Sequence, residues 1–296
     1  MTKKLTTLFK PGRIGDLEIR NRIVMAPMGV GYSTESGQAT DRLIAFYEAR
    51  AKGGVGLIST GGAYVCGMGK NQWRHQGIWD DDHIPGLAKV ADAIKVHGAA
   101  VFIQLIAPGA DMYERPKALP HPSMGSPPAE RSREEIDGLV ELFVQAARRA
   151  AEAGFDGIEI HGAHGYIISQ FLSPKTNART DEYGSSPANR ARLACQILIS
   201  IKQRLGRDFP VIFRMNGDDY IDGGLTLDEA VQQAPPDSGS RGRCPQCLRL
   251  HLSRVPLADT HGHAGVRLLV PSGGCGEEGG RGSGHHRGQA RRHGRS

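Results

Sequence analysis

The sequence predicts an α/β fold, a TIM (β/α)₈ barrel that is incomplete, with about five native strands, and is followed by an irregular tail. Short continuous apolar runs alternate with helical patterns over residues 1–234, and such runs are typical of parallel strands covered on both faces. This alternation fits an open or a closed sheet. Polar residues and glycines at the ends of the runs favour the closed barrel, and no glycine-rich dinucleotide fingerprint follows the first run.

The apolar runs are each short enough for one buried strand. They are RIVMAPM at 22–28, GVGLIST at 54–60, AAVFIQL at 99–105, GIEIHG at 157–162 and PVIFRM at 210–215. Gly29, Gly61, Gln104, His161 and Arg214 stand at or just beyond their C-terminal ends. Functional groups of barrel enzymes gather at that end of the strands. We therefore expect the site at this rim of the sheet.

The helices between these runs carry their own start and stop signals. Two capping boxes, with Glu three residues after the cap, predict helix starts at Ser132 and Thr226. Pro187 suits a first helical position, and Gly206 can end the helix that it begins. The predicted frameshift described below would cut short the helix after Thr226.

Residues 1–234 form one predicted unit, long enough to bury a substantial core. The unit has no apolar run of membrane-spanning length, and MTKKLTTLFKPG lacks the apolar segment of a signal peptide. Its cysteines, Cys66 and Cys195, lie far apart, which favours a reducing cytoplasm over a disulfide framework. Its charges balance, so we expect a cytoplasmic protein with no membrane or nucleic-acid partner.

Residues 235–296 carry the whole net charge of +6, with ten Arg against four acidic residues. They contain thirteen Gly but no Lys, Ile, Asn, Phe, Tyr, Trp or Met, and the absent types share codons rich in A and T. This composition indicates a GC-rich frame read out of register, and reading one base later permits the strand-like runs ALNVS and ITVGKLDDM. We infer a frameshift near Ala234 and a disordered low-complexity tail. The alternative is an RNA-binding basic arm on a non-enzymatic scaffold.

Three groups in this tail resemble metal or redox motifs, namely CPQC at 244–247, HGH at 261–263 and the pair His285 and His286. A single CxxC is a weak signal. Inside a segment that reads as out of frame these groups carry little weight, and we assign no metal site.

The stretch EAGFDGIEIHGAHGYIISQFLSPKTNARTDEYG, from Glu152 to Gly184, is the most informative part of the chain. His161, His164 and Tyr166 follow a predicted strand and could converge on one pocket. A structural His pair with a core Tyr is an equally supported interpretation of these residues alone. Two His without a suitably spaced third ligand do not make a zinc site.

Together with NRIVMAPM, VFIQL and the NR at 189–190, this stretch resembles the old yellow enzyme family of FMN-dependent oxidoreductases. Within the family, it more closely resembles the branch that contains bacterial 2,4-dienoyl-CoA reductases and bile-acid-type enoate reductases. The resemblance runs from about Leu8 to Gln233 and implies a TIM barrel, in agreement with the strand and helix pattern.

The resemblance implies FMN as cofactor and NAD(P)H as reductant. By motif position its flavin contacts fall on Ala26, Pro27, Met28, Gly62, Gln104 and Arg214. Small residues let the flat isoalloxazine approach the backbone. An amide such as that of Gln104 can donate to and accept from the pyrimidine edge, and Arg214 would place positive charge where reduced flavin becomes anionic.

The resemblance also implies catalytic roles. His161 and His164 match the pair that hydrogen-bonds the carbonyl oxygen of the substrate, and Tyr166 matches the proton donor. The expected substrate is a small molecule with an activated C=C bond: an enone, an enoate or a dienoyl thioester. A flavin-free lyase or isomerase that uses the same three residues for acid–base work is the alternative within enzymes.

Some features depart from the family pattern. Many relatives have His where this chain has Ala107, and a Thr or Cys where it has Gly29. As written, the chain has five barrel strands, which leave a sheet with an open edge, and it lacks the loops after strands seven and eight that hold phosphate in this fold. We therefore expect weak or absent FMN binding and poor solubility, which leaves the activity of the chain open. The iron–sulfur cluster and FAD of long relatives are not supported here. Substrate identity and oligomeric state are not set by the sequence.

Overall fold

The computed structural model describes residues 7–67, 73–110, 126–234, 257–258 and 264–270. Its central sheet contains five parallel strands in chain order, and they confirm the five predicted runs. They are β3 (Val24–Met25), β4 (Leu57–Tyr64), β6 (Ala100–Ile106), β7 (Gly157–Gly162) and β8 (Val211–Asn216). Sequential parallel strands joined by helices are the repeating unit of a (β/α)₈ barrel, and these make up the first part of one.

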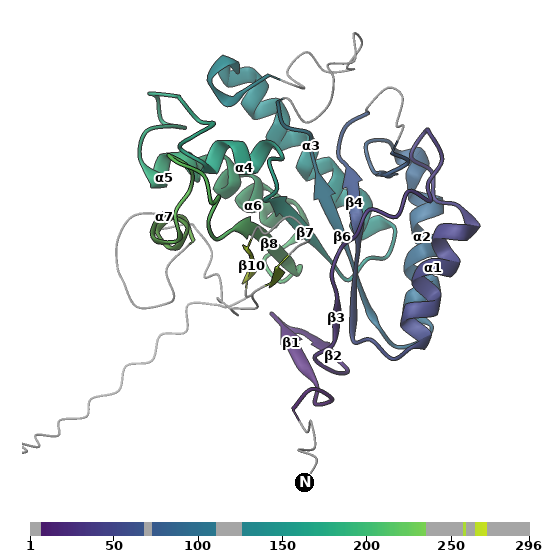
Figure 1. The fold of residues 1–296 in the computed structure, drawn as a ribbon. Coiled ribbons are helices and arrows are strands. Elements are labelled where there is room, and N and C mark those ends of the chain that lie inside the picture. The colour runs from purple at the N-terminus through teal and green to yellow at the C-terminus, as the bar shows by residue number, and fades with distance from the viewer. Residues whose placement is uncertain (1–6, 68–72, 111–125, 235–256, 259–263, 271–296) are drawn as a thin grey trace, which may run out of the picture.

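Helices cover the outer face of this sheet (Figure 1). The long ones are α1 (Asp41–Lys52), α2 (Ile84–Lys95), α3 (Arg133–Glu152) and α6 (Arg192–Leu205). Each presents apolar residues to the outward side chains of the strands, as Phe143 of α3 and Ile197 of α6 do, and both are fully buried in one continuous core. Burying one apolar face of each helix in this way stabilises the sheet from one side.

A hairpin that the sequence pattern did not predict closes the N-terminal ends of the strands. β1 (Gly12–Ile14) and β2 (Leu17–Ile19) pair antiparallel and lie below the sheet in Figure 1. Ile14 and Ile19 pack against Leu57, Phe102 and Ile212, which point into the barrel near the N-terminal ends of three strands. Strands of three residues are too short for a recognisable alternation.

Both predicted capping boxes are present. Ser132 caps α3, and its Oγ accepts from the backbone N–H of Glu135 at 3.2 Å. At the start of α7 (Leu227–Gln233), the hydroxyl of Thr226 accepts from the N–H of Glu229, and the carboxylate of Glu229 accepts from the N–H of Thr226. Gly206 ends α6 with φ of 95°, a conformation that favours glycine.

The helix predicted from Pro187 onward is instead two helices, α5 (Pro187–Arg190) and α6, which meet at Ala191. The buried guanidinium of Arg190 lies next to the break. It donates to the carbonyl oxygens of Leu172 and Ser185 and to Glu229, so it joins α5 to α4 (Ile167–Leu172) and to α7.

Short elements complete the loops at the C-terminal ends of the strands. They are β5 (Gln76–Gly77), which pairs with β4, and two 3₁₀ turns, η1 (Asp81–His83) and η2 (Pro128–Glu130). No helix among the described residues is long and apolar enough to cross a membrane.

The edge of β8 differs from expectation. We expected an open edge there, but β10 (Ala264–Val270) pairs with β8 antiparallel, and β9 (Leu257–Ala258) pairs with β10. A complete barrel would place a parallel strand beside β8. The remainder of 235–296, including CPQC, HGH and the His285 pair, lies outside the described residues.

Candidate active site

The inward side chains of β6, β7 and β8 change from apolar to polar along each strand. Alternate residues of a strand face the same side. Gln104 therefore shares the inward face of β6 with Phe102, and Arg214 shares the inward face of β8 with Ile212. Glu159 and His161 occupy the corresponding positions of β7. These four polar residues are at most 8% exposed. The structure thus collects buried polar groups at the predicted rim.

Strand register brings these groups together in pairs. Gln104 lies opposite Glu159 across β6 and β7, and His161 lies opposite Arg214 across β7 and β8. Facing residues of adjacent strands are within side-chain reach of each other. Two of the predicted flavin contacts therefore flank the strand that carries the first predicted catalytic histidine.

His161, His164 and Tyr166 form one cluster. The ring centroids of His161 and His164 are 4.8 Å apart with the planes at 87°, and the ring of Tyr166 is also 4.8 Å from that of His161. His164 has φ of 58°, and its backbone N–H donates to Oδ1 of Asn216 at 3.2 Å. A non-glycine residue in this region is strained, so the turn is held by β8 as well as by its own sequence.

Arg214 contacts His164, with Nη2 of the arginine 3.3 Å from Nε2 of the imidazole. A guanidinium only donates hydrogen bonds, so Nε2 of His164 must accept, and the neutral ring then carries its proton on Nδ1. His164 is consequently able to donate from Nδ1 to a group outside this pair.

The sequence interpretation missed Glu159. Its Oε1 accepts from Nε2 of Gln104 at 2.9 Å, and its Oε2 accepts from Oγ of Ser59 at 3.0 Å, so one carboxylate joins β4, β6 and β7. The carboxylate is fully buried. An acidic residue inside the apolar run GIEIHG, two positions before His161, was the available signal, because charged groups are buried only when they are bonded.

The end of β4 forms the other side of the rim. The register against β6 shifts between Thr60 and Ala63, and a bulge there contains Gly61 and Gly62. A Cβ on Gly61 would lie 2.1 Å from the carbonyl oxygen of Met28, so only glycine allows this approach of the two segments. A Cβ on Gly62 would meet Ile106 at 2.7 Å, which gives the predicted flavin contact a packing reason of its own.

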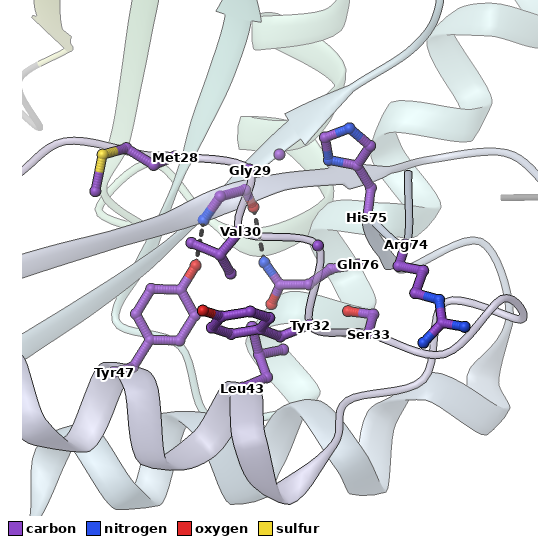
Figure 2. Close-up of a pocket in the computed structure, with 13 residues that line it drawn as sticks. Met28, Gly29, Val30, Tyr32, Ser33, Leu43, Tyr47, Arg74, His75 and Gln76 are labelled. Carbon is purple, nitrogen blue, oxygen red and sulfur yellow. Dashed lines mark hydrogen bonds between the residues drawn. The ribbon is translucent and has the colours of Figure 1, made fainter. Parts of the chain in front are cut away.

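Two buried side chains, Tyr47 and Gln76, bond to the backbone of this bulge (Figure 2). The N–H of Gly61 donates to the hydroxyl of Tyr47 at 2.7 Å, and its carbonyl oxygen accepts from Nε2 of Gln76 at 2.9 Å. Burial raises the pKa of Tyr47 to about 12. The phenol therefore stays protonated at neutral pH and can accept the Gly61 bond without introducing a buried charge.

A shallow pocket opens beside the bulge, with about 180 Å³ of empty space that is partly open to solvent. Met28 and Gly62 line it, whereas Gln104, Arg214 and the His161 cluster do not. Ligand sites are usually about 300–1,000 Å³ in volume. We therefore regard the pocket as one edge of the rim, and the convergent polar groups of β6 to β8 as its chemical part.

Three other predicted positions lie on this edge. Met28 is 52% exposed, Pro27 is buried and Ala26 is half-buried. At Gly29 the ring of His75 lies so close that a Cβ would be 2.7 Å from its Cε1. Burial lowers the pKa of His75, which favours a neutral ring.

Residues 7–253 match the family described as NADH:flavin oxidoreductase / NADH oxidase. The chain belongs to this family. It is 42% identical over 231 residues to an NADPH dehydrogenase of Bacillus subtilis, a match that covers 76% of this chain and 68% of the relative. It is 43% identical over 237 residues to an NADH oxidase of Thermoanaerobacter brockii, which covers 77% of this chain but 36% of the oxidase.

Two solved structures, a reductase and an old yellow enzyme homologue, share the fold. A 2-naphthoyl-CoA reductase complex superimposes with a TM-score of 0.70 at 33% identity, over 77% of this chain and 38% of that one. The old yellow enzyme homologue from Zymomonas mobilis gives 0.63 at 29% identity, over 77% of this chain and 69% of that one. These matches confirm the resemblance to old yellow enzymes and the barrel class of the fold. Flavin and a nicotinamide reductant follow for the family as a whole.

Proposed function

We propose that this chain derives from an FMN-dependent oxidoreductase that passes hydride from NAD(P)H, through the flavin, to an activated C=C bond of a small molecule. Membership of the flavin oxidoreductase family supports the redox class. The observation that carries the proposal is the set of buried polar groups, Gln104, Arg214 and the His161 cluster, at the C-terminal ends of three adjacent strands.

The residues at this rim fit the edge of a flavin. An isoalloxazine ring offers two carbonyl oxygens and an N–H along its pyrimidine side, and these need donors as well as an acceptor. Arg214 supplies donors and positive charge, and the amide of Gln104 supplies both functions. Bound FMN would supply the hydride chemistry that none of the twenty side chains provides.

The remaining groups fit the needs of an alkene conjugated to a carbonyl. Negative charge develops on the carbonyl oxygen as hydride reaches the β-carbon. Donors aimed at that oxygen lower the barrier, by about 3–4 kcal/mol per donor in comparable sites. We assign this role to His161 and His164, and His164 would donate from Nδ1 because its Nε2 accepts from Arg214.

Tyr166 is assigned the proton transfer. It stands beside His161 with ring centroids 4.8 Å apart and is half-buried. A phenol is a weak acid with an ordinary pKa of about 10, and it can protonate the α-carbon while remaining neutral beforehand.

The test uses the full chain with excess FMN under anaerobic conditions. NADPH is added first to reduce the flavin, and 2-cyclohexenone is added second to reoxidise it. In the Tyr166→Phe variant we expect the second step to slow about 100-fold while the first is unchanged, because general acid catalysis contributes about 10²–10⁴-fold. Equal rates of reoxidation in both proteins would contradict the role of Tyr166. Conversion of 2-cyclohexenone by the chain in the absence of flavin would favour the lyase or isomerase alternative.

A further inference from the structure

We propose that Glu159 is a positioning residue that fixes the orientation of the Gln104 amide, so that Gln104 offers its carbonyl oxygen to the N3–H of a flavin ring. This inference rests on the proposed flavin function. It assigns a role to a buried carboxylate that the resemblance did not identify.

Gln104 and Glu159 form a pair in which only Gln104 can donate. A carboxylate only accepts hydrogen bonds, so the group that Gln104 directs at Glu159 has to be its NH₂, as the 2.9 Å contact from Nε2 to Oε1 has it. The two ends of an amide are alike in shape and opposite in hydrogen-bonding character. Without a partner of fixed character the amide could turn over and exchange a donor for an acceptor.

The carboxylate of Glu159 is held in a fixed orientation. Glu159 is fully buried, and its other oxygen accepts from Ser59 at 3.0 Å, so both of its oxygens are held from neighbouring strands. Gln104 is itself only 4% exposed and lies in register with Glu159. A buried carboxylate that lies on a strand and accepts two hydrogen bonds orients its partner far better than a group on a loop would.

Gln104 has hydrogen-bonding groups besides the one that it gives to Glu159. The bond to Glu159 uses one N–H of Nε2, so the amide still has a second N–H and its carbonyl oxygen Oε1. An acceptor beside one donor matches the N–H and adjacent carbonyl of a flavin pyrimidine edge. A turned amide would set its NH₂ against the flavin N3–H, which is a repulsive arrangement.

The experiment compares lumiflavin with 3-methyllumiflavin, in which a methyl group replaces the N3 hydrogen. Neither probe carries a phosphate, so the comparison reports on the ring alone. Fluorescence titration of the full chain should give roughly tenfold tighter binding of lumiflavin, the value of about one good hydrogen bond. In Glu159→Gln we expect this preference to fall to about twofold or less, because an amide can donate as well as accept and no longer fixes Gln104.

Ser59→Ala is the matched control. It removes the bond to the other carboxylate oxygen but leaves a carboxylate facing Gln104, so the preference for lumiflavin should stay near tenfold even if both probes bind more weakly. If Glu159→Gln fails to fold, Gln104→Leu provides the second variant, and it should abolish the preference.

The outcomes separate the two proposals. A preference that persists in Glu159→Gln, or in Gln104→Leu, would overturn the role of Glu159 while leaving flavin binding intact. Loss of affinity for both probes by the same factor would mean a structural role only and would also overturn it. Because neither probe carries a phosphate, the missing phosphate loops do not account for a failure to bind them. If the unaltered chain binds neither probe, the rim does not recognise a flavin ring, and both the flavin proposal and this inference fail.

Discussion

The two ends of the sheet are built from the same strands but from opposite chemistry. At the N-terminal end Phe102 and Ile212 pack against the β1–β2 hairpin in a small apolar cluster. Two residues further along the same strands, Gln104 and Arg214 belong to a buried polar network. A period-two repeat thus lets one strand contribute to stability at one end and to chemistry at the other.

Substitutions at the apolar end should therefore change stability, and substitutions at the polar end should change binding and chemistry. Apolar contacts are non-directional, so their loss lowers the free energy of unfolding. Buried polar groups are costly unless they are bonded, and they are kept where orientation matters more than stability.

The largest effect is expected at the closed end. Phe102→Ala removes a fully buried ring that packs on the hairpin, and the free energy of unfolding should fall by about 3–5 kcal/mol. Urea denaturation followed by circular dichroism measures it. Val96→Ala, at a position that is 74% exposed, serves as control and should cost no more than about 0.5 kcal/mol. A loss below about 1 kcal/mol for Phe102→Ala would mean that the hairpin does not seal this end.

A smaller effect is expected at the rim. Tyr47→Phe removes the acceptor of the Gly61 N–H and leaves that group unsatisfied, which should cost about 1–3 kcal/mol. The pKa of Tyr47 is raised from 10.0 to about 12, so the folded state holds this proton more tightly than the unfolded state.

The Tyr47 contribution is therefore complete below pH 10 and is lost as the pH rises from 10 toward about 12. Denaturation at pH 8 and pH 11 measures it, and the variant should lack this part of the alkaline loss of stability. Identical pH profiles for the two proteins would show that Tyr47 is not buried as described.

The smallest effect is expected on the outer layer. Ser132→Ala removes the α3 cap and should lower the free energy of unfolding by about 1 kcal/mol. Because the cap contacts neither end of the barrel interior, binding of lumiflavin should be unchanged at temperatures where the variant is folded. A change in that binding would couple the outer helices to the rim and weaken the division between the two ends.

Elements with strong local signals could be predicted from the sequence. The five strands, the two capping boxes and the end of α6 at Gly206 all followed from periodicity and from cap chemistry. The β1–β2 hairpin could not be predicted, because its strands have three residues each and its partners lie far away in the chain.

The site was partly predictable for a related reason. His161, His164 and Tyr166 are close in the sequence and are brought together by one turn. Glu159 looked like an interruption of an apolar run, and its bonds to Gln104 and Ser59 depend on a strand order that the sequence alone does not state. The roles of these residues toward a flavin stay predictions.

Hydrogen exchange of the full chain with and without saturating lumiflavin tests the division of the sheet most directly. We predict slower exchange of backbone amides at the C-terminal ends of the strands, within residues 28–31, 61–64, 104–107, 161–166 and 214–216, and no change in the hairpin at 12–19. Protection centred on the hairpin, or no protection at the rim once the ring is bound, would contradict the account.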